Sequence, residues 1–358
     1  MSCFEGKLSR LLLTIWLMLL VTAPGSADLA GPPRYSVLQD ESLFWLKDPA
    51  GNPFFSFGIN VVDRGENSER IDSQQSPPAS YRARSFYPSD ADWAAATVGR
   101  LERWGFNTCG GWSVWDLLRQ VRGTQVAHSP VLHFGSIAGA PWRDLWSDQW
   151  FYDLKTAALN TIRKSDSRVI GHYSDNELDW WNGALFRETL AHPASSGMRQ
   201  RLVALLQLQY GNDWNQLLQD FEPEGVASFE ELKKAGQVFL RPGGSGIRSY
   251  RNFLTMISAR YYRTTTEIMN RQDPHGLLLG DRYMAYYYPE LARTAGLEVD
   301  VVSTNLKASW NDGSFARFYL SSLHKLSGKP VIVSEFYLAA MENRSGNRNT
   351  KGGFPTVL

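Results

Sequence analysis

Two glutamates that follow apolar segments are the residues of this chain whose type and placement best fit catalysis. Glu177 follows the segment 171–176, and Glu335 follows 330–334 near the other end of the sequence. In a barrel of parallel strands both would lie at the carboxyl ends of strands, on the face that carries the active site. Two carboxyl groups about 5–5.5 Å apart can hydrolyse a glycosidic bond with retention of configuration. The pair therefore predicts a retaining glycosidase, although either glutamate alone fits a solvated loop carboxylate equally well.

Further polar residues stand near the ends of the predicted strands. Arg282 and Tyr283 follow the fifth strand and can border the site, and Asn305 ends the sixth. Asp175 is expected either to orient the carboxyl group of the nearby glutamate or to hold the loop. His172 lies one position before a tyrosine, so strand alternation points the two side chains to opposite faces. It fits a packed structural histidine as well as a ligand contact.

To position these residues, the chain alternates short apolar strands with amphipathic helices. Several strands are almost continuously apolar, which is typical of parallel strands covered on both faces. The predicted strands are 54–59, 106–109, 130–134, 168–173, 276–280, 299–304 and 330–335. The predicted helices are 151–164, 198–220, 249–271, 287–295 and 314–326. This alternation indicates an α/β fold built on a parallel sheet.

Local signals mark elements in the first third of the chain. Residues 43–57 have the pattern of a strand, a turn and a second strand, and the polar segment 63–85 is expected to be a surface loop. Ser89, with Asp92 three residues later, has the spacing of a capping box at the start of a helix. That helix is predicted to carry Trp93, Leu101 and Trp104 on its apolar side.

The number of predicted strands is one short of a closed barrel. We expect a TIM-type (β/α)8 barrel that lacks the eighth strand and helix, because the segment after Glu335 is short and loop-like. The first and seventh strands would then have unpaired edges. The long segment between the fourth and fifth strands, with a Gly-rich turn at 242–244, is predicted to be a helical insertion over the barrel mouth. The chain therefore has the pattern of a C-terminally truncated barrel.

Four segments carry a resemblance to a known family. They are Phe57-Gly58-Ile59-Asn60, Gly105-Phe106-Asn107-Thr108-Cys109-Gly110-Gly111-Trp112-Ser113, Tyr173-Ser174-Asp175-Asn176-Glu177-Leu178 and Ser334-Glu335-Phe336. In this order they resemble the retaining glycosidases that carry an Asn-Glu pair and a late-strand Glu on a (β/α)8 barrel. Within that clan the chain most resembles the β-agarases of glycoside hydrolase family 50, from about residue 43 to residue 355.

The resemblance implies a role for each matching residue. Glu177 would be the general acid/base and Glu335 the nucleophile. Asn176 would bond the sugar hydroxyl next to the anomeric centre, and Asn60 would contact the same subsite. Three tryptophans would be stacking platforms for sugars, with loop or core packing as the alternative: Trp112, Trp180 and Trp181. Many clan members place a tyrosine near the end of the sixth strand, where it positions the nucleophile; here Leu306 follows Asn305.

Composition limits the classes of partner. The chain has 358 residues with 37 Lys+Arg against 36 Asp+Glu, a balance that offers no excess of positive charge for nucleic acid. Its 13 tryptophans fit carbohydrate stacking and a large core equally well. Cysteine and histidine show no metal-ligand spacing, so neither a metal nor another cofactor is expected. The sequence gives no indication of the oligomeric state.

The N-terminus resembles an export signal. Lys7 and Arg10 precede an apolar run from Leu11 to Ala23, and small residues follow at a plausible cleavage site. We expect residues 1–27 to be a signal peptide and 28–358 to be one catalytic domain, secreted or held in a bacterial periplasm or cell envelope. The apolar run is short for a bilayer span, although an uncleaved anchor is an alternative. Cys109 would be the single cysteine of the mature chain, so no intramolecular disulfide is expected.

Three functions fit the sequence. The first is hydrolysis of β-galactosidic bonds in an agar-like polysaccharide, and the second is the same mechanism on another β-galactan or β-glycan. Loops determine which of these glycans is the substrate, and a single sequence does not reveal that specificity. The third is a non-catalytic glycan-binding remnant, because an incomplete barrel would fail to hold the two glutamates in register. No phosphate-binding loop or nucleophile elbow is present.

Overall fold

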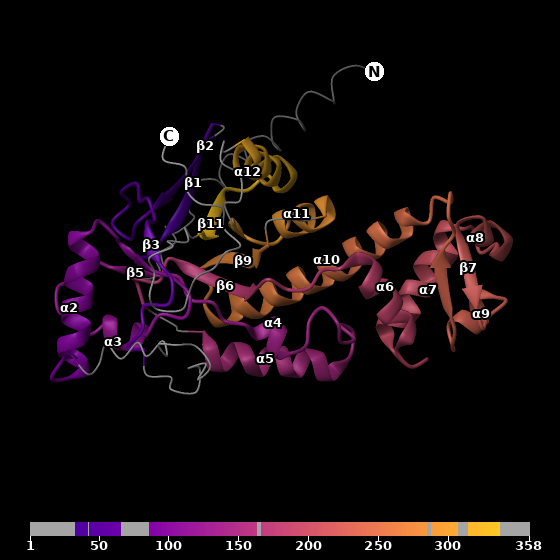
Figure 1. The fold of residues 1–358 in the computed structure, drawn as a ribbon, viewed down its shortest axis with the longest axis horizontal. Coiled ribbons are helices and arrows are strands. Elements are labelled where there is room, and N and C mark those ends of the chain that lie inside the picture. Colours follow the sequence, from indigo (N-terminus) through magenta and orange to yellow (C-terminus); the bar gives the residue numbers. More distant parts are fainter. Residues whose placement is uncertain are drawn as a thin grey trace, which may run out of the picture. The chain divides into compact units, whose positions relative to one another are not determined.

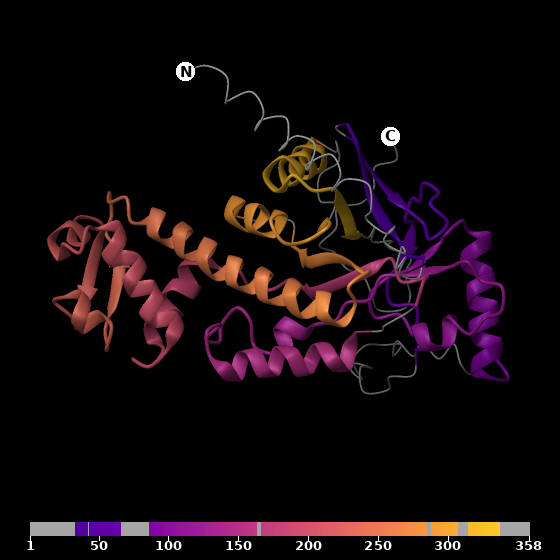
Figure 2. The same ribbon diagram turned by 180° about the vertical axis from the view of Figure 1, so that it is seen from behind.

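The computed structural model describes residues 33–41, 43–65, 86–162, 166–284, 288–306 and 314–336 (Figures 1 and 2). The expected signal peptide at 1–27 and the segment after Phe336 lie outside the described residues, as does most of the polar loop 63–85. No helix in the described part of the chain is long and apolar enough to cross a membrane.

Seven parallel strands of the described residues form two sheets that meet edge to edge. The first sheet has the order β3 (Gly58–Ile59), β4 (Thr108–Cys109), β5 (Ala127–His128). The second has the order β6 (Gly171–Asn176), β9 (Leu277–Tyr283), β10 (Val302–Asn305), β11 (Val331–Glu335). Parallel bridges from His128 to Val169 and from Val131 to Tyr173 join β5 to β6. The prediction of an α/β fold with parallel strands is confirmed.

Six of the seven predicted strands overlap an observed one, and the third is displaced. The strand expected at 130–134 is observed at β5 (Ala127–His128), and beyond it only Val131 makes an isolated bridge. The reason is local: His133 has a left-handed backbone, with φ 56°, and helix α4 (Phe134–Ile137) begins directly after it. An apolar run alone does not reveal such a turn.

The helices that pack against the second sheet follow the amphipathic patterns closely. They are α5 (Asp148–Thr161), α10 (Ile247–Gln272), α11 (Pro289–Gly296) and α12 (Ser314–Ser327). Their buried faces meet Leu278, Tyr283 and Val302 of the strands in the largest apolar cluster. A second cluster, with Tyr173, Leu279 and Val301, lies on the other face of the strands. The strands are thus covered on both faces, as their apolar sequences require.

Helix α2 (Asp90–Arg103) begins as its sequence predicts. Ser89 is the N-cap, and its hydroxyl accepts from the Asp92 backbone N–H at 3.1 Å. Trp93 and Leu101 are buried as expected, but Trp104 is 62% exposed. The expectation for Trp104 is wrong because it is the C-cap residue, where the helix ends and its apolar face no longer continues. The short helix α3 (Trp115–Leu118) completes this part of the core.

The chain between β6 and β9 contains more than the predicted helix 198–220. It forms α6 (Asn182–Ala191), α7 (Gly197–Gln209), α8 (Trp214–Asp220) and α9 (Phe229–Leu232), followed by α10. Two antiparallel strands, β7 (Phe221–Glu224) and β8 (Gln237–Leu240), pair within this segment (Figure 1). Sequence patterning missed these strands because each has only four residues and β7 contains Pro223, which is rare in a strand.

An N-terminal hairpin covers the amino ends of the parallel strands. β1 (Ser36–Asp40) pairs with β2 (Leu43–Lys47), and β1 was not predicted because its residues are mostly exposed and polar. The second strand of the predicted 43–57 hairpin is reduced to one bridge, at Pro53. Nearby, buried Tyr35 packs with Ala127 and Ile170. The opposite, carboxyl ends of the strands are therefore the face left for a site.

Candidate active site

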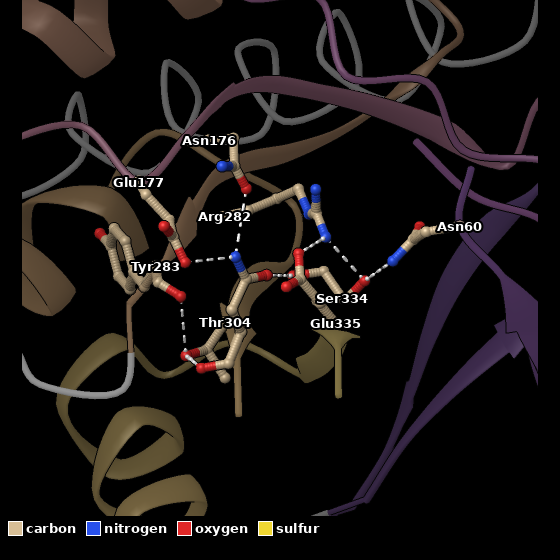
Figure 3. Close-up of polar contacts among 9 residues, drawn as sticks. Asn60, Asn176, Glu177, Arg282, Tyr283, Thr304, Ser334 and Glu335 are labelled. Atoms are coloured by element: carbon tan, nitrogen blue, oxygen red, sulfur yellow. Dashed lines mark hydrogen bonds and ion pairs between the residues drawn. The ribbon is translucent and has the colours of Figure 1, made fainter. Parts of the chain in front are cut away.

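The two predicted catalytic glutamates lie at the carboxyl ends of β6 and β11. Glu335 is the last residue of β11, and Glu177 directly follows β6. Glu177 has a left-handed backbone, with φ 50°, and its N–H donates to the Arg282 carbonyl at 3.0 Å. Figure 3 shows the two side chains turned toward the same group of polar residues. The structure thus brings into one network two residues that are far apart in sequence.

Asn305, at the end of β10, connects the two glutamates. Its Nδ2 donates to Glu177 Oε1 at 3.0 Å and to Asn176 Oδ1 at 3.1 Å. Its Oδ1 accepts from the Ser334 hydroxyl at 2.9 Å, one residue before Glu335. Asn305 is fully buried, so these contacts hold its amide in one orientation. Asn176 then presents its own Nδ2 as a donor, because its Oδ1 is already in use.

Arg282, on β9, contacts the second glutamate. Its Nη2 lies 3.0 Å from Glu335 Oε2 and donates to the Ser334 carbonyl, also at 3.0 Å. The same carbonyl accepts from Asn60 Nδ2 at 3.0 Å, so β3 is linked to β11 at this point. Arg282 was expected to border the site as a sugar contact. It has no exposed surface, and the group that it contacts is Glu335.

Trp112 and His133 form an aromatic pair beside Arg282. The Arg282 guanidinium carbon lies 4.8 Å from the centre of the Trp112 ring, and the His133 ring centre lies 5.6 Å from it. Trp112 remains 44% exposed, as a sugar platform requires. His133 was missed by the sequence analysis, although it lies in the predicted third strand. Burial and the Arg282 charge lower the pKa of His133, so the neutral imidazole is favoured.

Two glycines let the Trp112 turn approach its neighbours. A Cβ atom on Gly111 would lie 2.7 Å from Val131 Cγ2 and 3.5 Å from Arg282 Nη1. A Cβ atom on Gly110 would overlap the Asn60 side chain. The Gly110-Gly111 pair is thus required by close packing on both sides of the turn. Trp112 itself has φ 58°, a conformation that costs a non-glycine residue about 1–2 kcal/mol.

The adjacent tryptophans Trp180 and Trp181 differ in environment. Trp180 is 3% exposed, and its Nε1 donates to Asp281 Oδ2 at 3.2 Å. The expectation of a sugar platform is wrong for Trp180, because the turn at Glu177 directs its ring into the core. Trp181 is 52% exposed and donates to Asp179, so it keeps an accessible ring.

Tyr283 and Asp175 are also buried rather than placed at the mouth. The Tyr283 hydroxyl bonds Tyr262 at 2.5 Å, on the side of the helices, because alternation along β9 turns it away from Arg282. Asp175 accepts from Tyr261 at 2.5 Å and from two backbone N–H groups of α4. It therefore holds the loop, the second of the two expected roles, and neither residue is placed to contact a sugar.

Two buried ionisable groups have displaced pKa values. Burial raises the pKa of Asp175 to about 6. Burial, with the nearby Asp175 carboxylate, raises the pKa of Asp281 to about 8, so Asp281 is mainly protonated at neutral pH. Asp281 accepts from the Trp180 indole and the Leu178 backbone N–H, and so supports the turn that follows Glu177. No sequence pattern marks Asp281 for this position.

His172 is a packed residue and not a ligand contact. It has no exposed surface, and burial with the Arg34 and His128 charges lowers its pKa to about 4. It belongs to the amino-terminal end of the strands, where Arg34 pairs with Asp273 at 3.0 Å. Among the described residues, no group of three His, Cys, Asp or Glu side chains could hold a metal ion.

Comparisons with known proteins agree with the resemblance seen in the sequence. No family model matches the chain. It is 25% identical to beta-agarase A of Vibrio sp. (strain JT0107), over 88% of this chain and 38% of that protein. It is 23% identical to beta-agarase B of the same organism, over 72% of this chain and 28% of that protein. The chain therefore spans less than half the length of these curated relatives.

Solved structures share the fold. The crystal structure of the agarase AgWH50C superposes with a TM-score of 0.67 at 19% identity, covering 88% of this chain and 53% of that one. The structure of an exo-beta-agarase gives a TM-score of 0.66 at 18% identity, covering 87% and 54%. The chain is thus a protein similar to the glycoside hydrolase family 50 β-agarases, in sequence and in fold.

Proposed function

We propose that this chain is the catalytic part of a retaining glycoside hydrolase that cleaves β-galactosidic bonds in an agar-like polysaccharide. The observation that carries the proposal is the polar network in which Asn305 bonds Glu177 and reaches Ser334, while Arg282 pairs with Glu335. The network contains two carboxyl groups with different partners. Such a difference is what separates a nucleophile from a proton donor in a glycosidase.

Glu335 is the proposed nucleophile. The Arg282 guanidinium lies 3.0 Å from its carboxylate and would hold that group in position for attack on the anomeric carbon. Glu177 is the proposed acid/base. It accepts from a neutral amide, that of Asn305, and would protonate the leaving oxygen and later take a proton from the attacking water.

The remaining accessible side chains would bind the sugar. Asn176 presents its Nδ2 group beside Glu177 and would donate to the hydroxyl next to the anomeric centre, a bond that strengthens in the transition state. Trp112 and Trp181 expose about half of their surfaces (44% and 52%) and would stack on sugar faces. No metal or other cofactor is needed for this chemistry.

The substrate class follows from the curated relatives, which are named as β-agarases. We therefore favour an agar-like galactan over other β-galactans or β-glycans.

We also propose that the fold is part of a (β/α)8 barrel. The strand order β3-β4-β5-β6-β9-β10-β11 would be the first seven strands of a (β/α)8 barrel, with α6 to α9 and the β7–β8 hairpin as an insertion after the fourth.

A glycan-binding protein without catalysis is the second candidate. The observation that favours it is that β3 and β11, the two ends of this strand order, have no strand between them in the described part of the chain. An eighth strand supplied by a longer chain would complete the barrel.

We also propose that residues 1–27 direct export of the protein. N-terminal sequencing of protein recovered outside the bacterial cytoplasm would test this proposal.

The decisive experiment is release of reducing sugar from agarose, porphyran, carrageenan and a plain galactan. We expect activity on agarose, with the β-anomer formed first in proton NMR, and none in the Glu335→Ala variant. A form extended at the C-terminus should be measured in parallel. Activity of the extended form alone would support the glycan-binding role for the present chain, whereas equal activity of Glu335→Ala and the unmodified protein would contradict the proposed nucleophile.

A further inference from the structure

We propose that Trp112 is a positioning residue for the nucleophile, acting through Arg282, in addition to any contact that it makes with sugar. This inference rests on the proposed function. The argument begins with Arg282, which has no exposed surface and carries a positive charge into the interior. A buried guanidinium needs partners on most of its donors and on its faces.

The hydrogen bonds of Arg282 account for only part of what holds it. Its Nη2 donates to Glu335 and to the Ser334 carbonyl. Its Nε and Nη1 are buried and have no hydrogen-bond partner among the described residues. Because both contacts with β11 come from a single nitrogen, they do not by themselves fix the tilt of the guanidinium plane.

Aromatic rings provide the missing restraint. The Arg282 guanidinium carbon lies 4.8 Å from the Trp112 ring centre and 5.6 Å from that of Tyr173. Stacking of this kind stabilises an arginine by about 0.5–2 kcal/mol, more when the pair is removed from water. The orientation of Nη2 toward Glu335 therefore depends on the Trp112 ring.

The Trp112 turn is built for this contact. Gly111 lets the turn pack tightly on Val131, since an added Cβ would lie 2.7 Å from its Cγ2, and the same position is at ordinary contact distance, 3.5 Å, from Arg282 Nη1. Trp112 follows with a left-handed backbone, φ 58°. This turn places the Trp112 ring against the buried Arg282 guanidinium. The exposed part of Trp112 and the part that covers Arg282 belong to one rigid ring, which couples sugar binding to the nucleophile.

The test isolates the step in which the nucleophile attacks. A 2-deoxy-2-fluoro-β-galactosyl fluoride reacts when a Glu335 carboxylate oxygen bonds to C1 and the C1–F bond breaks, releasing fluoride and leaving a glycosyl ester. Intact-protein mass spectrometry gives the labelling rate as a function of reagent concentration and pH. Fluoride leaves with little help from an acid, so the rate reports mainly the orientation and ionisation of Glu335.

Trp112→Leu keeps apolar volume without a π face, and Trp112→Phe keeps a smaller face. We expect Trp112→Leu to lower the maximal labelling rate about tenfold and to move the acidic limb of the pH profile upward. Trp112→Phe should restore most of this rate. The matched control is Trp104→Leu, on the exposed tryptophan that caps the C-terminus of α2, 5.9 Å from the Arg100 guanidinium, and it should label like the unmodified protein.

The outcomes are distinct. If Trp112→Leu changes only the half-saturating reagent concentration, and neither the maximal labelling rate nor the acidic limb of the pH profile, the inference is overturned. Trp112 would then act only as a stacking platform for sugar. If thermal melting shows that Trp112→Leu does not fold, the same labelling rates are measured on Arg282→Lys. It keeps the charge but has no planar face, so a rate and pH limb equal to those of the unmodified protein would also overturn it. No labelling of the unmodified protein would instead count against the proposed function.

Discussion

The ends of β6 and β11 give the same type of side chain different hydrogen-bond donors. At the end of β11, Glu335 lies against the Arg282 cation. At the end of β6, Glu177 accepts from the Asn305 amide, and the turn behind it is supported by Asp281, a carboxyl group whose pKa burial raises to about 8. The difference teaches that residues of one type, at equivalent strand ends, can meet different donors: a guanidinium at Glu335 and an amide at Glu177.

The largest effect should follow from removing the carboxylate beside the cation. Glu335→Ala deletes the nucleophile, and we expect kcat on agarose to fall by at least about 10⁴-fold. Added azide should restore turnover and give a glycosyl azide of inverted configuration, measured by NMR. Rescue with retained configuration would mean that the attacking group is elsewhere.

Removing the carboxyl group at the end of β6 should have a smaller effect, one that depends on the leaving group. For Glu177→Ala we expect a loss of about 10³-fold on agarose, because the leaving oxygen needs a proton. On an activated aryl galactoside, whose leaving group needs none, the glycosylation step should be nearly unaffected. An equal loss of activity on agarose and on the aryl galactoside would contradict the assignment of Glu177 as the acid/base.

A change at Asn305 should make the surroundings of Glu177 and Glu335 less different. Asn305→Asp replaces the amide that donates to Glu177 with a second carboxylate. Because like charges favour the protonated form of a neighbouring acid, the alkaline limb of the pH–rate profile should move to higher pH, with a loss in kcat of about tenfold. Stopped reducing-sugar assays from pH 4 to pH 9 measure this shift, and an unchanged alkaline limb would contradict it.

The smallest effect on activity is expected at Asp281, where stability is the better measure. Its folded-state pKa of about 8 exceeds the value of 3.8 for an exposed carboxyl group, so the folded state binds the proton more tightly. The stability from this group is present at low pH and is lost as pH rises from about 4 to about 8. Asp281→Asn cannot ionise, so its melting temperature relative to the unmodified protein should rise across that range.

The matched control for this prediction is Asp40→Asn, at an exposed aspartate of β1. Its melting temperature should follow that of the unmodified protein at every pH. Parallel melting curves for Asp281→Asn and the unmodified protein would show that Asp281 is ionised when folded.

Sequence patterning predicted the strands and the two glutamates because apolar runs and amphipathic helices are local signals. It did not predict the pairing of Arg282 with Glu335, which depends on the register between β9, β10 and β11. It also did not separate Trp180 from Trp181, because the left-handed turn at Glu177 decides which ring enters the core. The strand predicted at 130–134 was misplaced for a similar reason, since His133 has a left-handed backbone and α4 begins directly after it.

The Ser334 carbonyl oxygen accepts from both Asn60 and Arg282, so one peptide group joins the first strand of the described order, the last strand and the cation. A displacement of β3 away from β11 would pull on that peptide and rotate the residue that follows it. Movement of β3 relative to β11 would therefore act on the residue before Glu335 and on the cation that pairs with its carboxylate.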